Sequence, residues 1–132
     1  MYVNAVAVFA AGVLSMVLGL IWYLPTVFGK VWMKESGLTE KDIESGPGVG
    51  YLLTFAGSLL MAIAMSILAN YGGTRTVLGG LKLGALVGLG IVATSFAANY
   101  IFSKKSLKLY LVDAGYFVTH AVITGVIVSV VR

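Results

Sequence analysis

Four long apolar runs leave this chain few ways to fold. They extend over about residues 4–23, 49–71, 77–102 and 107–131. At the helical rise of about 1.5 Å per residue, each run can cross the hydrocarbon core of a bilayer, which is about 30 Å thick. Strands of a membrane β-barrel would instead alternate apolar and polar residues over about ten positions. The sequence therefore predicts an all-α membrane protein, a single domain over residues 1–132 with four transmembrane helices in a bundle.

The composition excludes several classes of function. Charged residues make up 11% of the 132 residues, against about 25% in soluble domains. The chain has no cysteine and one histidine, which removes thiolate zinc sites and iron–sulfur clusters, so no metal or other cofactor is expected. The net charge of +4 would suit nucleic acid in a soluble protein, but here the basic residues lie in short connectors. There they indicate topology and contact with anionic lipids, not nucleic acid.

The basic residues also predict an orientation. One side of the membrane would hold six lysines, and the other side three basic residues. By the positive-inside rule the lysine-rich side is cytoplasmic, with anionic lipids as partners there, and both termini face outward. The lysine-rich set is Lys30, Lys34, Lys41, Lys104, Lys105 and Lys108, and the other set is Arg75, Lys82 and Arg132.

The first connector, residues 25–46, has a helical pattern of its own. Val27, Phe28, Val31 and Trp32 recur at helical spacing, which predicts a short amphipathic helix lying in the membrane interface. Thr39 then begins one more short helical turn. Aromatic rings and lysines around this connector are typical of an interfacial belt, although a ledge for a lipid or a partner protein is an alternative. The predicted anchor residues are Trp22, Tyr23, Pro25, Phe28, Lys30, Trp32 and Lys34.

The same stretch carries a resemblance to a known family. The pattern is Asn4, then Gly19-x-x-Trp22-Tyr23-x-Pro25-x-x-Phe28-Gly29-Lys30-x-Trp32 and Gly37-Leu38-Thr39, with Asp113-Ala114-Gly115-Tyr116 in the last run. It resembles the bacterial membrane-protein family called domain of unknown function 1761, over essentially the whole chain. The resemblance implies four membrane helices and no established activity. Leu24 departs from the small residue usual before the proline.

Small residues line one face of each apolar run. In lipid such residues let helix backbones approach, so they are the main packing signal. The last run also has a second, polar face, and we therefore expect one face to pack within the chain and the other against a twin, giving a homodimer or another membrane-protein contact. The packing candidates are Ala11, Ser15, Gly19, Ser58, Ala62, Ser66, Gly80, Gly84, Gly88, Ala121 and Gly125.

Two ionisable residues are the sharpest candidates for a function. Asp113 and His120 lie two helical turns apart on one face, and ionisable groups inside a membrane often mark proton or ion routes. The alternative is that each makes one interhelical hydrogen bond and only stabilises packing. Haem between two copies of His120 is a weaker alternative. The predicted polar cluster comprises Asp113, Tyr116, His120, Thr124, Ser95 and Asn99.

These patterns favour a non-enzymatic protein of a bacterial inner membrane. Asp113 is the single carboxylate outside the first connector, so neither a paired-carboxylate site nor a catalytic triad is available. The leading interpretation is a structural or accessory protein that self-associates through its small-residue faces. The alternative is a small transporter or channel for protons, ions or a small solute, which uses the polar cluster.

Overall fold

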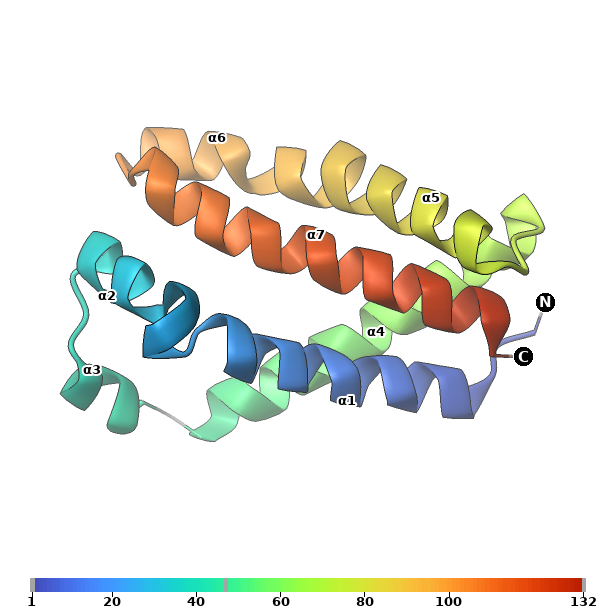
Figure 1. Cartoon of the computed structure of the whole chain (residues 1–132), viewed down its shortest axis with the longest axis horizontal. Coiled ribbons are helices and arrows are strands. Elements are labelled where there is room, and N and C mark those ends of the chain that lie inside the picture. Colours follow the sequence, from blue (N-terminus) through green and yellow to red (C-terminus); the bar gives the residue numbers. More distant parts are fainter. Residues whose placement is uncertain (1, 47, 132) are drawn as a thin grey trace.

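The computed structural model describes residues 2–46 and 48–131, and within them it is all helical (Figure 1). Four spans form the bundle. The first is α1 (Ala5–Trp22), the second α4 (Gly48–Gly72) and the fourth α7 (Leu107–Val130). The third runs from α5 (Val77–Val87) through a π-helical segment, η2 (Gly88–Ala93), into α6 (Thr94–Phe102). These bounds agree with the four predicted runs to within one residue at each end.

All four spans are long and apolar enough to cross a bilayer. The chain is therefore a multi-pass membrane protein, and the predicted all-α class is confirmed. An even number of spans returns the chain to the side where it began, and Figure 1 shows both termini at the same end of the bundle. The connector that contains α2 and α3 lies at the opposite end, together with the end of α6.

Helix α7 lies at the centre of the bundle. Half of its most apolar stretch is buried, against 28% for each of the other spans, because α7 packs against α1, α4 and α5 together. Met65, Ala69, Val87 and Val128 form one apolar cluster between α4, α5 and α7. A residue on α7 is consequently surrounded by protein on several sides, and a polar group placed there meets side chains from other spans.

Helices α5 and α7 approach each other most closely where glycines face each other. A Cβ added to Gly80 would lie 2.6 Å from the carbonyl oxygen of Gly125, and one added to Gly84 would meet the backbone of Val122. The other predicted packing residues are also covered by helices of this one chain, because all of them are buried except Gly19, which is half-buried. Both faces of α7 thus contact other helices of the chain, but Phe117 on the polar face is 38% exposed. The expected pairing with a twin stays a prediction.

The first connector is helical, as the pattern predicts. It begins with a π-helical turn, η1 (Pro25–Gly29), continues as α2 (Lys30–Ser36) and turns at Gly37, whose φ of +74° suits glycine. Thr39 and Asp42 then form a capping box that starts α3 (Glu40–Glu44). Helix α2 lies against α7. Its position in a membrane interface stays a prediction.

Candidate functional site

Asp113 is the side chain on which three parts of the bundle converge. The Tyr23 hydroxyl, directly after α1, donates a 2.6 Å hydrogen bond to Oδ1, and the Tyr100 hydroxyl, on α6, donates a 2.5 Å hydrogen bond to Oδ2. Asp113 itself is 8% exposed. Hydrogen bonds to a carboxylate are among the stronger ones in proteins. The carboxyl group therefore ties the end of the first span and the end of the third span to the last span.

The chain reaches this geometry because α1 ends in a sharp turn. Leu24 is extended, as expected before proline, and Pro25 then opens η1. The Gly29 N–H closes this turn by donating to the Leu24 carbonyl at 2.8 Å. A Cβ on Gly29 would collide with the carbonyl oxygen of Tyr23, so this position has room for glycine alone. The turn brings the following helix, α2, back over α7.

The indole of Trp22, at the end of α1, also contacts α7. Its Nε1 donates a 3.0 Å hydrogen bond to the Val112 carbonyl, and a Cβ added to Gly115 would lie 3.0 Å from the indole ring. The Tyr23 ring lies 5.6 Å from that of Trp32. These three aromatic residues were predicted to anchor the chain in the head-group region, but they contact α7 or each other because α2 folds back across the bundle. Lys30 and Lys34 are exposed, as expected of anchors.

The π-helical segment η2 determines which residues of α6 face Asp113. A π-helical turn holds an extra residue, which rotates everything after it by about one position, or about 100°. In a straight helix the face of Gly84 and Gly88 would continue to Ser95 and Asn99, whereas in the structure both of these are exposed. Ser95 donates to the Ile91 carbonyl in its own span, and Asn99 accepts from Ser103. The prediction that they join the polar cluster is therefore wrong.

Phe96 and Tyr100 occupy the inward positions instead. The Phe96 ring lies 5.5 Å from that of Tyr110 and 5.9 Å from that of Phe117, both on α7. Tyr110 also donates a 2.7 Å hydrogen bond to the carbonyl of Ala93, at the end of η2. Tyr100 was not predicted as a site residue, because an aromatic residue at the end of a span has the pattern of an interfacial belt.

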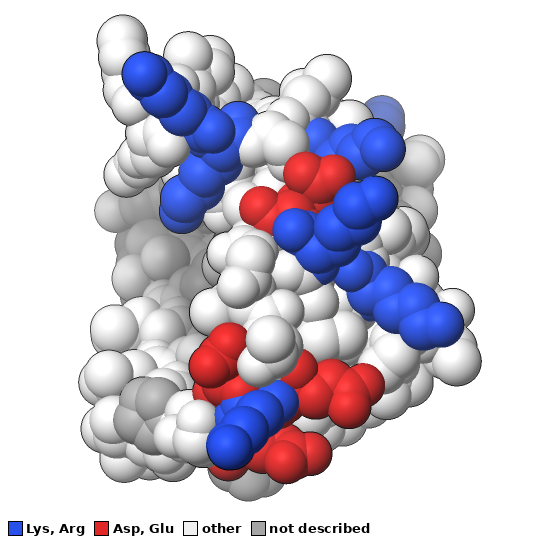
Figure 2. Space-filling view, turned by 90° about the vertical axis from the view of Figure 1, so that its left-hand side faces the viewer, with Lys and Arg blue, Asp and Glu red and all other residues white. Residues whose placement is uncertain are grey.

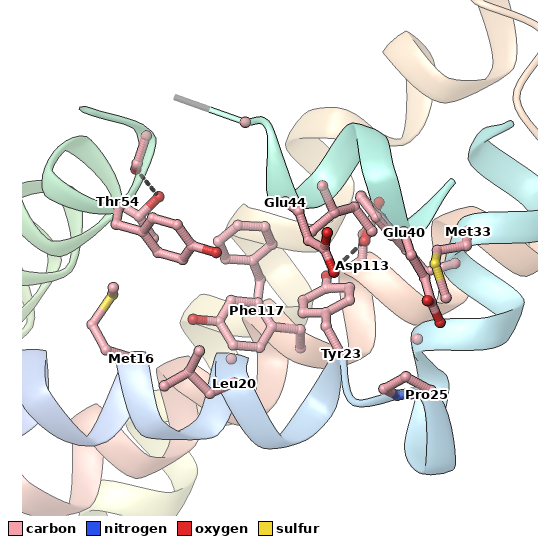
Figure 3. Close-up of a pocket in the computed structure, with 18 of the residues that line it drawn as sticks. Met16, Leu20, Tyr23, Pro25, Met33, Glu40, Glu44, Thr54, Asp113 and Phe117 are labelled. Carbon is pink, nitrogen blue, oxygen red and sulfur yellow. Dashed lines mark hydrogen bonds between the residues drawn. The ribbon is translucent and has the colours of Figure 1, made fainter. Parts of the chain in front are cut away.

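A pocket of about 860 Å³ opens beside Asp113 (Figure 3). Figure 3 shows Met16 and Leu20 on α1, Thr54 on α4, and Glu40 and Glu44 on α3 around the Tyr23–Asp113 pair. The wall has an aromatic, an acidic and an aliphatic part. The aromatic part consists of Tyr23, Trp32, Tyr51, Tyr100, Tyr116 and Phe117. The acidic part consists of Asp113, Glu40 and Glu44, and the aliphatic part includes Met16, Leu20, Pro25, Met33 and Ile43.

A second cavity of about 420 Å³ lies on the other side of the same side chains. Trp32, Tyr100 and Asp113 line both cavities, so they form the wall between them. Lys105 lines the second cavity, and its Nζ lies 4.8 Å from the centroid of the Tyr100 ring. That distance is within the range of a cation–π contact. The two cavities thus differ in charge, with the larger one acidic.

A comparison with family models finds one match. The family described as "Protein of unknown function (DUF1761)" matches residues 6–129. The chain belongs to this family. No curated protein and no solved structure matches it. Two of the stretches that carry the resemblance to this family, one around Trp22 and Tyr23 and one around Asp113, contact each other in the structure.

The rest of the predicted polar cluster of this DUF1761 protein does not join Asp113. Tyr116 is buried, but its hydroxyl donates to the Ser15 carbonyl at 3.0 Å. The ring of His120 lies 6.0 Å from that of Tyr116, and both of its nitrogens lack a hydrogen-bond partner among the described residues. The same is true of the Thr124 hydroxyl. No chain of hydrogen bonds within the described residues connects Asp113 to His120.

Proposed function

We propose that this protein is a non-enzymatic membrane protein that binds a small amphiphilic solute in the pocket beside Asp113. The observation that carries the proposal is the pocket itself, which joins a carboxyl group held by two tyrosines to an apolar wall. Its volume of about 860 Å³ is within the range of small-molecule sites, roughly 300–1,000 Å³. Such sites combine a mostly apolar lining with a few fixed polar groups.

The rim of the pocket supports an amphiphile over a purely polar solute. Leu20 and Tyr51, on two membrane spans, are 61% and 58% exposed, whereas Glu40 and Glu44 are exposed on α3 outside the spans. A solute bound here would have an apolar part beside the spans and a polar part beside α3. Binding at this position suits a small transporter or an accessory protein that presents the solute to a partner.

The wall chemistry supports binding over catalysis. The hydroxyls of Tyr23 and Tyr100 both donate to Asp113, so they hold its carboxyl group in one orientation. The described lining contains no histidine, lysine or cysteine. A rigidly held carboxyl with aromatic neighbours suits recognition.

Self-association through the small-residue faces has less support. The glycines of α5 and α7 that would carry it face each other within the chain. A homodimer is still a proposal, but it would have to use an exposed face, such as the first turns of α4, where Leu52 and Leu53 are each 65% exposed. Its test is the mass of the purified protein in detergent or nanodiscs.

Filling the pocket tests the proposed binding. Gly50 lines the pocket, Gly57 does not, and a Cβ at either position on α4 meets nothing within 4 Å. Gly50→Phe therefore places a ring in the pocket, and Gly57→Phe places the same ring on the outer surface. We expect a small molecule, identified by mass spectrometry, to co-purify with the wild type and Gly57→Phe and to be lost from Gly50→Phe. Equal recovery from all three proteins, or none from any, would contradict the proposal.

A further inference from the structure

We propose that the solute taken by this pocket is a lipophilic organic cation, an inference that rests on the solute-binding function proposed above. The first argument is the charge of the wall. The chain has nine Lys and Arg against five Asp and Glu, yet the described lining of the pocket holds three carboxyl groups and no basic residue. The three are Asp113, Glu40 and Glu44.

This acidic wall is part of a wider separation of charge at one end of the bundle. Figure 2 shows the acidic residues of the end face in two groups. The larger group lies apart from most of the basic side chains, with one basic residue across it, and the smaller group lies among them. Glu40, Asp42 and Glu44 supply acidic residues within the five-residue helix α3. A positively charged solute that approaches this end is attracted to that region, whereas an anion is attracted to the lysines outside it.

The aromatic rings supply the second argument. Six of them line the pocket, and neighbouring rings are steeply inclined, with 70° between Tyr23 and Trp32 and 55° between Tyr23 and Tyr116. The face of an aromatic ring is negative and attracts cations. In the proposed complex, the cation lies against the faces of more than one of these rings. One of the six rings already contacts a cation, because the ammonium group of Lys105, in the second cavity, lies over the Tyr100 ring.

Size and desolvation favour an organic cation over an inorganic one. The pocket is many times larger than a bare metal ion, and both oxygens of Asp113 already accept tyrosine hydrogen bonds. No group of three His, Cys, Asp or Glu side chains within the described residues is arranged to hold a metal. A cation whose charge is spread over an apolar body is weakly hydrated and fills space beside Met16, Leu20 and Met33.

Three aromatic probes separate charge from shape, because the cation and the anion among them have the same four-ring shape and the third is a smaller, neutral molecule. These are tetraphenylphosphonium, tetraphenylborate and the neutral triphenylmethanol, each measured separately by equilibrium dialysis against the protein in lipid nanodiscs, with empty nanodiscs as the correction for lipid partition. We expect tetraphenylphosphonium to bind at least about tenfold more tightly than the other two, since several ring faces and carboxyl groups contribute. Gly50→Phe should abolish this binding, and Gly57→Phe should leave it unchanged.

A charge variant adds a second readout. The double variant Glu40→Gln, Glu44→Gln should weaken tetraphenylphosphonium binding several-fold, whereas Glu35→Gln, which changes a residue of the second cavity, should not. Binding of the anion or the neutral probe in preference to the cation, still blocked by Gly50→Phe, would overturn the cation inference and leave solute binding intact. Failure of all three probes to bind in a Gly50-dependent manner would overturn both.

Discussion

The hydroxyl of Tyr23 and the carboxyl group of Asp113, ninety residues apart in sequence, are joined by a 2.6 Å hydrogen bond. The bond links the turn after the first span to the last span. Tyr100, on the third span, donates a second hydrogen bond to the same carboxyl group. Because these side chains also line the pocket, the groups that hold this end of the bundle together are the groups that a solute would meet. Stability and binding should therefore respond together to substitutions here.

A double-mutant cycle tests this link. Tyr23→Phe removes the donor, and Asp113→Asn replaces an oxygen acceptor by an amide. Each single variant should lower the free energy of unfolding by about 1–3 kcal/mol, because a hydrogen bond to a carboxylate is lost inside the protein. The two changes should be non-additive by about 0.5–3 kcal/mol, as expected of groups in contact. The measurement is reversible unfolding in mixed micelles.

The control for that cycle is Tyr71→Phe. Tyr71 is 76% exposed at the end of α4, so the loss of its hydroxyl should change stability by less than about 0.5 kcal/mol. Additive effects of Tyr23→Phe and Asp113→Asn would mean that the two side chains do not interact in the folded protein.

The crossing of α5 and α7 gives a second prediction. In Gly84→Ala the new methyl group would be pressed against the backbone of Val122, so the helices must separate, at a cost of about 1–3 kcal/mol. Gly57→Ala on α4 has open space and should be neutral or stabilising by up to about 1 kcal/mol, because alanine favours the helix. The same unfolding assay compares the two. A neutral Gly84→Ala would show that α5 and α7 are not in such close contact.

The spans and their packing residues could be predicted from the sequence because both depend on local pattern. An apolar run of about 20 residues predicts a membrane helix from its length alone. Small residues four positions apart indicate the face on which helices meet. Asp113 could be singled out for a similar reason, since a carboxyl group within an apolar run needs a partner. These inferences require no knowledge of which helix lies beside which.

The partners of Asp113 could not be predicted, because they depend on two features of the whole fold. Tyr100 faces inward only because η2 rotates α6, and nothing in the stretch Gly88–Ala93 marks a π-helix apart from its two glycines. Tyr23 turns inward because α2 folds back over α7. The pocket depends on the placement of α3 as well, which the sequence predicts as a helical turn but not as a wall facing the first and second spans.

Acid should weaken α3 by removing one half of its capping box. Backbone and side-chain hydrogen bonds from Thr39 lower the pKa of the Asp42 carboxyl below its ordinary value, and Asp42 is fully exposed. A depressed pKa means that the cap stabilises α3 above about pH 4 and loses this effect as the pH falls through the lower, folded-state pKa. Helical NMR shifts of residues 40–44 should decrease over that range. Asp42→Ala should show smaller helical shifts than the wild type already at pH 7, because it keeps only the hydrogen bond from the residue 42 N–H to the Thr39 hydroxyl. Wild-type shifts that do not change in acid would contradict the assignment.

Cysteine labelling tests the predicted orientation. Because the chain has no cysteine, each single substitution introduces the only thiol. Ser45 and Ser103 are exposed at the lysine-rich end, and Arg75 is exposed at the other. By the positive-inside rule, a membrane-impermeant maleimide added to spheroplasts should label Arg75→Cys and spare Ser45→Cys and Ser103→Cys. Labelling of all three would indicate both orientations, and the reverse pattern would place the lysines outside.

His120 should be dispensable for folding in spite of its central position. Its side chain is 3% exposed, and neither ring nitrogen has a partner among the described residues. A buried polar group without a hydrogen bond costs about 1–3 kcal/mol, so His120→Leu should leave the free energy of unfolding unchanged or raise it by up to that amount. Asp113→Leu is the contrasting variant. It leaves the hydroxyls of Tyr23 and Tyr100 without their hydrogen-bond acceptor and should destabilise the bundle. If His120→Leu instead destabilises the protein by more than about 1 kcal/mol, the imidazole forms a hydrogen bond with a group outside this chain. That group would be a buried water, a bound solute or a second copy of the protein.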